Sequence, residues 1–256
     1  IGFEDAMRAV DLSVIFLLIG MMTCVEVLSA TGFFEWIAVL IAKKTGGNAI
    51  LILALILLLT MIASALLDNV TTVILLVPVI ILITQILEIP TTPFIILMAV
   101  ASNVGGTATL IGDPPNIIIG SKGDLSFNDF LFNLTPGVMI IGAAFVGTSL
   151  LILRRKLEVP HNIRARIMDS YPELALRDRK KMWISLSVFA VMFACFFLQK
   201  VLHLEAGTIA LGGMAVMLMT CKLKSELLLK AIQMDTIMFF IGLFILIGAL
   251  EHNGVL

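Results

Sequence analysis

The stretch ASNVGGTATLIGDPPNIIIG, residues 101–120, interrupts an apolar chain with glycines, prolines and small polar side chains. Together with the apolar residues before it, it has the length of one membrane span, yet Gly105-Gly106 and Pro114-Pro115 disfavour a continuous helix. Backbone that leaves the helix at membrane depth is tolerated only where it is buried in protein or lines a wet cavity. We therefore predict a discontinuous helix over residues 94–120, with an unwound centre that binds a solute.

The composition of the whole chain indicates a membrane protein. Its 256 residues are 60% hydrophobic and 14% charged, with a mean hydropathy of +1.11, whereas soluble domains are about half apolar and about a quarter charged. The apolar runs lack the alternation of a membrane β-barrel, which favours helices. The three cysteines are isolated from one another and form no metal-binding or disulfide pattern. We expect an all-α multi-pass membrane protein without a resident metal or a soluble cofactor.

Apolar segments of span length recur along the sequence. Residues 1–153 are interpreted as the core of a first repeat, 154–182 as a basic loop, and 183–256 as the truncated start of a second repeat. The first repeat would contain a span at 11–30, an interfacial amphipathic helix at 33–44, a re-entrant hairpin at 48–87, the broken helix at 94–120, a polar loop at 121–134 and a span at 136–153. Further spans are predicted at 183–201, 206–221 and 236–250.

The basic residues predict the orientation. Residues 154–182 contain nine of the seventeen Lys and Arg: Arg154, Arg155, Lys156, Arg164, Arg166, Arg177, Arg179, Lys180 and Lys181. Short loops with this bias remain on the cytoplasmic side, which favours a topological role over nucleic-acid binding. Counting spans from this loop places Lys43 and Lys44, and also Lys222, Lys224 and Lys230, on the same side. We expect a protein of the plasma (inner) membrane with loop 154–182 in the cytoplasm.

Two segments of the sequence resemble each other. GMMTCVEVLSATGFF begins at Gly20 and GLFILIGALEHNGVL begins at Gly242, so that Gly20, Leu28 and Gly32 match Gly242, Leu250 and Gly254 at one constant offset. The predicted topology gives the two copies opposite orientations, as in transporters built from inverted repeats. The second copy breaks off near its beginning, so we expect this chain to be a fragment of a longer one.

A second polar cluster lies at the tip of the predicted hairpin, between residues 64 and 72. An intramembrane carboxylate is a candidate functional group, so Asp68 could bind a cation or carry a proton, or it could cap the helix that begins near Val70. Glu26, in the middle of the first span, is a further candidate for a proton or cation. The predicted ion- or substrate-binding residues are Ser64, Asp68, Asn69, Thr71, Thr72, Ser102, Asn103, Gly105, Gly106, Thr107, Thr109, Asp113 and Asn116.

At LLDNVTTVILLVPV (66–79) and ASNVGGTATLIGDPPNI (101–117) the chain resembles the arsenite-permease and NhaD branch of the ion transporter superfamily. Its similarity is greatest to permeases related to the pink-eyed dilution P protein, with a citrate-transporter-like domain. The resemblance implies inverted repeats whose hairpin tips and broken helices meet at a central site. By the same resemblance, Ser102, Asn103 and Thr107 occupy a position that holds Na⁺ and substrate carboxylate in distant relatives.

The predicted function is secondary active transport of a small inorganic or organic anion, arsenite-like or carboxylate-like, coupled to Na⁺ or H⁺ by alternating access. A transient Na⁺ would lie near Asp68, Asn69, Ser102 and Asn103. An NhaD-type Na⁺/H⁺ antiporter and a passive channel are alternatives. An intramembrane aspartyl protease using Asp68 and Asp113 is disfavoured, because the element before Asp113 lacks the first glycine of Gly-x-Gly-Asp; we expect no enzyme. The expected partners are lipid and the small ion, with a homodimer left open.

Overall fold

The computed structural model describes residues 2–123, 125–154, 157, 160, 171–221 and 231–253. The regular secondary structure of these residues is entirely helical, as the sequence predicts. The chain divides into two compact units, one formed by Ile1–Leu28 and Trp183–Leu256 and the other by Ser29–Met182. Each unit is described separately below.

The first unit is built from apolar helices at the two ends of the chain. Close contacts of small residues hold α2 against α12: a Cβ built on Gly20 would lie 2.6 Å from the carbonyl carbon of Ala210, and one on Gly207 would overlap the backbone of Ser13. Cys24 of α2 also lies against Met192 of α10, with 3.9 Å between the two sulfur atoms. The helices are α1 (Phe3–Arg8), α2 (Leu12–Ala30), α10 (Arg179–Phe197), α11 (Gln199–Leu202), α12 (Ala206–Cys221) and α14 (Met234–His252).

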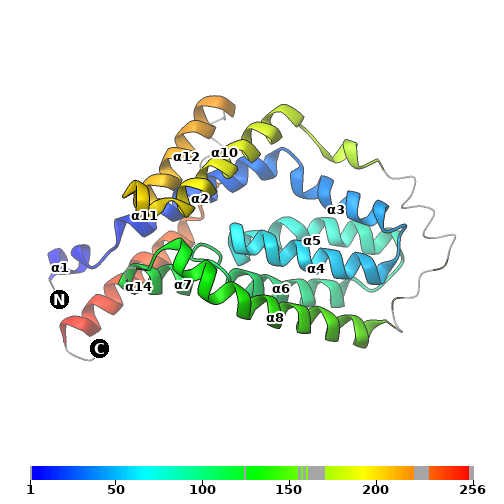
Figure 1. Ribbon diagram of the computed structural model, residues 1–256, viewed down its shortest axis with the longest axis horizontal. Coiled ribbons are helices and arrows are strands. Elements are labelled where there is room, and N and C mark those ends of the chain that lie inside the picture. The colour runs from blue at the N-terminus through cyan, green and yellow to red at the C-terminus, as the bar shows by residue number, and fades with distance from the viewer. Residues whose placement is uncertain are drawn as a thin grey trace. The chain divides into compact units, whose positions relative to one another are not determined.

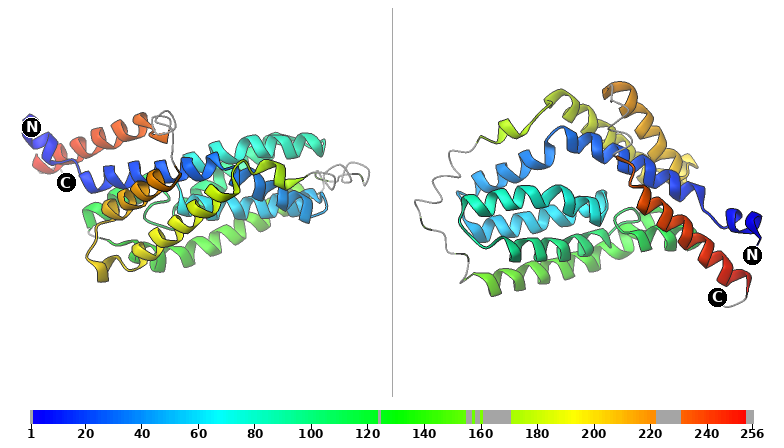
Figure 2. Two further views of the ribbon diagram at one scale, coloured as in Figure 1. Left: turned by 90° about the horizontal axis from the view of Figure 1, so that it is seen from above. Right: turned by 180° about the vertical axis from the view of Figure 1, so that it is seen from behind.

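The second unit contains the predicted hairpin and the broken helix. Within it, α6 packs against α4, α5 and α8, and α4 also contacts α3, α5 and α8, so that the long helices lie side by side (Figures 1 and 2). The elements are α3 (Phe33–Lys44), α4 (Ala49–Leu66), α5 (Asn69–Ile86), α6 (Thr91–Gly106), α7 (Pro114–Gly123), α8 (Phe127–Leu153) and a short 3₁₀ turn, η1 (Pro172–Ala175).

The core of the second unit lies along the faces of α4 and α6. Ile52, Leu53 and Leu57 of α4 are fully buried, and so are Phe94 and Met98 of α6. A Cβ built on Gly105 of α6 would overlap the backbone of Met61 on α4. The glycine therefore lets the two helix backbones approach closely, which is how helices in membranes commonly associate.

The helix that follows the broken segment begins earlier than the sequence suggests. We expected a polar loop over residues 121–134 and a span from Pro136, but α7 continues to Gly123 and α8 begins at Phe127, with Pro136 inside it. Ser126 and Asp129 form a capping box, in which the Ser126 N–H donates to Asp129 Oδ2 at 2.8 Å. This local pair outweighs the polarity of the segment and starts the helix.

The amphipathic helix α3 is tied to the chain before α10. Gly32 precedes α3 with φ of 81°, and the Thr31 carbonyl accepts a hydrogen bond from the Arg177 N–H at 2.9 Å. The guanidinium of Arg177 lies 3.8 Å from the Glu35 carboxylate. These contacts join the two ends of the second unit, where the chain continues into the first.

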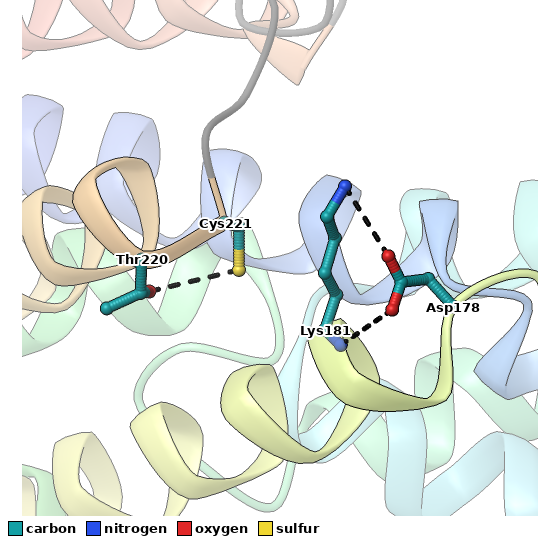
Figure 3. A network of polar contacts seen from close by, with 4 residues as sticks. All are labelled: Asp178, Lys181, Thr220 and Cys221. Atoms are coloured by element: carbon teal, nitrogen blue, oxygen red, sulfur yellow. Dashed lines mark hydrogen bonds and ion pairs between the residues drawn. The ribbon is translucent and has the colours of Figure 1, made fainter.

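Asp178 caps the beginning of α10. Its carboxylate accepts a hydrogen bond from the Lys181 N–H at 3.0 Å and lies 3.5 Å from the Lys181 ammonium (Figure 3). The backbone hydrogen bond from Lys181 lowers the pKa of the Asp178 carboxyl. The negative charge is therefore kept at a helix N-terminus, where it is favourable.

Among the described residues, six helices are long and apolar enough to cross a membrane: α2, α4, α5, α8, α10 and α14. The chain is therefore an integral multi-pass membrane protein. Both arms of the predicted hairpin are among the six, and their re-entrant geometry stays a prediction. Several residues used to predict topology and repeats lie outside the described residues: Arg155, Lys156, Arg164, Arg166, Lys222, Lys224, Lys230 and Gly254.

Candidate functional site

The tip of the α4–α5 hairpin meets the broken helix. The Asn69 side-chain amide, at the start of α5, donates to Asn103 Oδ1 at 3.0 Å and to Asp113 Oδ1 at 3.2 Å. Asn103 lies near the end of α6, and Asp113 directly precedes α7. One amide therefore links the start of α5 to two helix ends that lie 34 and 44 residues further along the sequence.

The polarity of these helix ends suits charged solutes. The N-termini of α5 and α7 carry roughly half a positive charge each, and the C-terminus of α6 roughly half a negative charge. The positive ends of these helix dipoles favour an anion, and carboxylate and amide oxygens near them favour a cation. The three ends thus provide partners for both kinds of ion at one place.

Asp68 has the capping role that was one of its predicted alternatives. It precedes α5, and its Oδ1 accepts a hydrogen bond from the Thr71 N–H at 2.7 Å. A cap of this kind satisfies one of the donors left free at a helix N-terminus. The carboxylate that bonds directly to the Asn69 amide is that of Asp113.

The break itself spans residues 107–113, between the end of α6 and the start of α7. Pro114 and Pro115 are the first two residues of α7, where a missing N–H is not costly. Gly105 and Gly106 still belong to α6. A Cβ on Gly106 would lie 2.5 Å from the Gly112 carbonyl oxygen and 3.2 Å from Ser64 Oγ. The glycine pair therefore permits close approach of backbone rather than unwinding, which corrects the reason for which we singled it out.

Several predicted ligands instead bond to the backbone of the site. Ser64 Oγ donates to the Ser102 carbonyl at 2.6 Å, and Thr109 Oγ1 donates to the Ala65 carbonyl. The Asn116 amide donates to the carbonyls of Thr107 at 3.2 Å and Thr109 at 2.9 Å. These side chains thus satisfy backbone carbonyls in and around the break, because a buried carbonyl without a partner is costly.

Two buried polar atoms at the hairpin tip have no hydrogen-bond partner among the described residues: Asn69 Oδ1 and Thr72 Oγ1. Thr72 is 1% exposed and lies on α5 within one turn of Asn69. Buried oxygens without a donor are unusual in proteins and suit a bound cation or an ordered water. Together with Asn103 and Asp113, these atoms form the candidate site.

Three of the remaining predicted residues make local hydrogen bonds within their own segments, and Glu26 belongs to the other unit. The Thr107 hydroxyl donates to the Asn103 carbonyl, one helical turn earlier, at 2.8 Å. The Ser102 hydroxyl likewise donates to the Ala99 carbonyl at 2.9 Å. The Thr71 N–H binds Asp68. Glu26 is half-buried on α2, in the part of the chain that belongs to the first unit.

Sequence reasoning missed Thr135. This residue lies on α8, and its hydroxyl donates to the carbonyl of Ala108 in the break at 3.2 Å. We placed it between the predicted loop at 121–134 and the predicted span at 136–153. The only local signal is the following Pro136, since a hydroxyl beside a helix proline is a common way to satisfy displaced backbone.

A buried, broken helix that meets a hairpin tip within a set of apolar helices is typical of membrane transporters. Comparison with known proteins supports this class: the chain belongs to the citrate transporter family, whose model CitMHS matches residues 1–256.

The similar proteins include ones named as transporters, a membrane protein and a magnetosome protein. An uncharacterized transporter of Mycobacterium tuberculosis (strain H37Rv) is 40% identical over 259 residues, which cover 100% of this chain and 60% of the relative. A 46 kDa membrane protein of Mycobacterium leprae is 40% identical over 99% of this chain and 59% of its own length. The magnetosome protein MamN of Magnetospirillum gryphiswaldense is 32% identical over 66% of this chain and 39% of its own length. The chain thus spans about 60% of the length of its mycobacterial relatives.

Proposed function

We propose that the protein is a secondary active transporter of the plasma membrane that moves a small anion, coupled to Na⁺ or H⁺, by alternating access. The observation that carries this proposal is the Asn69 amide, which bonds to Asn103 and Asp113 where the hairpin tip meets the broken helix. A helix break at membrane depth that presents helix ends to a solute is the usual site of secondary transporters.

The charges of the candidate site favour a cation as the first ion to bind. Asp113 contributes a carboxylate, and Asn69 Oδ1 and Thr72 Oγ1 are buried oxygens that accept no hydrogen bond from the described residues. An anion approaching these oxygens would be repelled until a Na⁺ or a proton neutralised them, because like charges in a poorly solvated site interact strongly. Cation-dependent anion binding is the physical basis of the proposed coupling. We place the Na⁺ near Asn69, Asn103 and Asp113. Asp68 would support the site by capping α5.

The substrate class follows from the site and the family together. The family description names citrate, and a carboxylate would suit the positive ends of the helix dipoles at the starts of α5 and α7. The resemblance of the broken segment to arsenite permeases supports an arsenite-like oxyanion as an alternative to a carboxylate. We propose a small oxyanion or carboxylate as the substrate.

A Na⁺/H⁺ antiporter of the NhaD type is the second candidate. Asp113 favours it, because a carboxylate at the meeting point of three helix ends can exchange a proton for a cation. Such an antiporter would need no anion. A passive channel has the same predicted elements but would not show counterflow.

Flux measurements with the full-length protein in proteoliposomes separate these functions. We expect uptake of labelled citrate or arsenite that depends on a Na⁺ or pH gradient, and counterflow when the gradient is removed. Na⁺-driven proton movement without any anion uptake would instead favour the antiporter. Anion flux that needs no coupling ion and shows no counterflow would contradict secondary transport and favour a channel.

A further inference from the structure

The break in the helix has three consecutive carbonyls, those of Thr107, Ala108 and Thr109, and each accepts a hydrogen bond from a side chain. The Asn116 amide bonds to the first and the third, at 3.2 and 2.9 Å. The second bonds to the Thr135 hydroxyl at 3.2 Å. Asn116 comes from α7, directly after the break, whereas Thr135 comes from α8. The central carbonyl therefore depends on a helix outside the hairpin and the broken helix.

The hydrogen bond of Thr135 differs from those of other threonines in the long helices. Threonine hydroxyls in helices usually bond to a carbonyl one turn back in the same helix. Seven threonines of the described residues, in helices or directly after them, do so with acceptors four residues earlier: Thr23, Thr45, Thr60, Thr84, Thr107, Thr148 and Thr220. The Thr135 hydroxyl instead donates across 27 residues of sequence to Ala108.

Among the described residues that line the cavity beside Ala108, no side chain other than Thr135 is a donor. Ala108 is 6% exposed, and Thr135 lies beside it in a cavity of about 630 Å³ between α4, α6 and α8. Thr135 is the one lining residue whose side chain carries a hydroxyl, amide or charge; the others include Met61, Ala65, Gly105 and Gly142. In such an apolar environment, loss of the hydroxyl would leave the Ala108 carbonyl unpaired or force it to move.

We propose that Thr135 is a positioning residue that fixes the unwound segment 107–113 by binding the Ala108 carbonyl, and so sets the geometry of the ion site at Asn103 and Asp113. This inference rests on the proposed transport function for its flux readout, but not for its structural one. Asn116 and Thr135 bond to adjacent carbonyls of the same segment. A shift of the backbone at Ala108 would therefore also move Asp113, which lies at the end of that segment. Thr135 touches no solute in this proposal; it acts through the backbone.

The test compares three variants of the full-length protein in proteoliposomes. Thr135→Val keeps the shape of the side chain and removes the donor, Thr135→Ser keeps the donor, and Thr148→Val is a matched control on the same helix. The Thr148 hydroxyl is exposed and donates to the carbonyls of Ala144 and Phe145 on its own helix. We expect Thr135→Val to raise the half-saturating concentration of the coupling cation by about tenfold. Thr135→Ser should restore it, and Thr148→Val should match the unmodified protein.

A second measurement does not require the transported ion to be known. Hydrogen exchange followed by mass spectrometry should show faster exchange of the peptide covering residues 107–113 in Thr135→Val, with α4 unchanged. Unchanged exchange there, or a Thr135→Ser variant as impaired as Thr135→Val, would overturn the positioning role. If exchange accelerates as expected while the unmodified protein moves no ion, the positioning role stands and the proposed transport function fails.

Discussion

The side-chain amide of Asn69 lies 3.2 Å from Asp113 Oδ1, although 44 residues of sequence separate the two. The contact joins the start of α5 to the residue before α7, and the same amide bonds to Asn103 at the end of α6. Because the Asn69 side chain bonds to both Asn103 and Asp113, its removal should disturb the position of each.

Asn69→Ala should reduce coupled flux by about tenfold or more, because a hydrogen bond to a carboxylate contributes roughly 1.5–3 kcal/mol. The measurement is the initial rate of gradient-driven uptake in proteoliposomes. Asn133→Ala is the control, since the exposed Asn133 amide donates to the Asp129 carbonyl on its own helix at 2.7 Å. Equal rates in Asn69→Ala and in the control would show that Asn69 does not contribute to the site.

Two carboxylates near the hairpin tip should respond differently to the same change. Asp68→Asn should preserve folding, because Asn caps a helix about as well as Asp. Asp113→Asn should weaken the dependence of flux on the coupling cation more than Asp68→Asn does, because Asp113 bonds directly to the Asn69 amide. The comparison requires flux as a function of Na⁺ concentration and pH for both variants. A greater loss in Asp68→Asn would identify Asp68 as the coupling carboxylate.

Gly105→Ala should destabilise the protein by about 1–3 kcal/mol, since the new methyl group would overlap backbone atoms of Met61. Backbone within a packed helix cannot move aside as the end of a flexible side chain can. Gly147→Ala on α8 is the matched control, because open space surrounds that position and alanine favours a helix. Thermal unfolding in detergent measures both. Equal melting temperatures would show that α4 and α6 can separate without cost.

Gly32→Ala should destabilise the start of α3 by about 2 kcal/mol or more, because it combines a left-handed backbone with overlap on the Ala175 carbonyl. Gly46→Ala carries the backbone strain alone, with φ of 60° and open space around it, so about 1 kcal/mol is expected. Thermal unfolding in detergent should report the difference between the two variants. Greater damage from Gly46→Ala would argue against the contact between Ala175 and Gly32.

The sequence predicted the helices well where local properties decide them. The bounds of α2, α3, α4, α5 and α12 agree with the expected segments to within two residues, because apolar runs and the polar residues between them are local features. It also predicted an interrupted helix over residues 94–120, and the structure places the interruption at residues 107–113, after the glycine pair. It was wrong about the start of α8, where one capping box overrides the polarity of the surrounding residues.

The sequence determined that this chain spans a membrane in helices and that one helix is interrupted by polar backbone. Only the tertiary structure decided which polar side chains satisfy that backbone and which remain for a solute. Ser64, Thr109 and Asn116 bond to carbonyls, whereas Asn69 links Asn103 to Asp113. The reason is physical: helix formation depends on neighbours along the chain, but a buried hydrogen bond depends on partners that folding alone brings together.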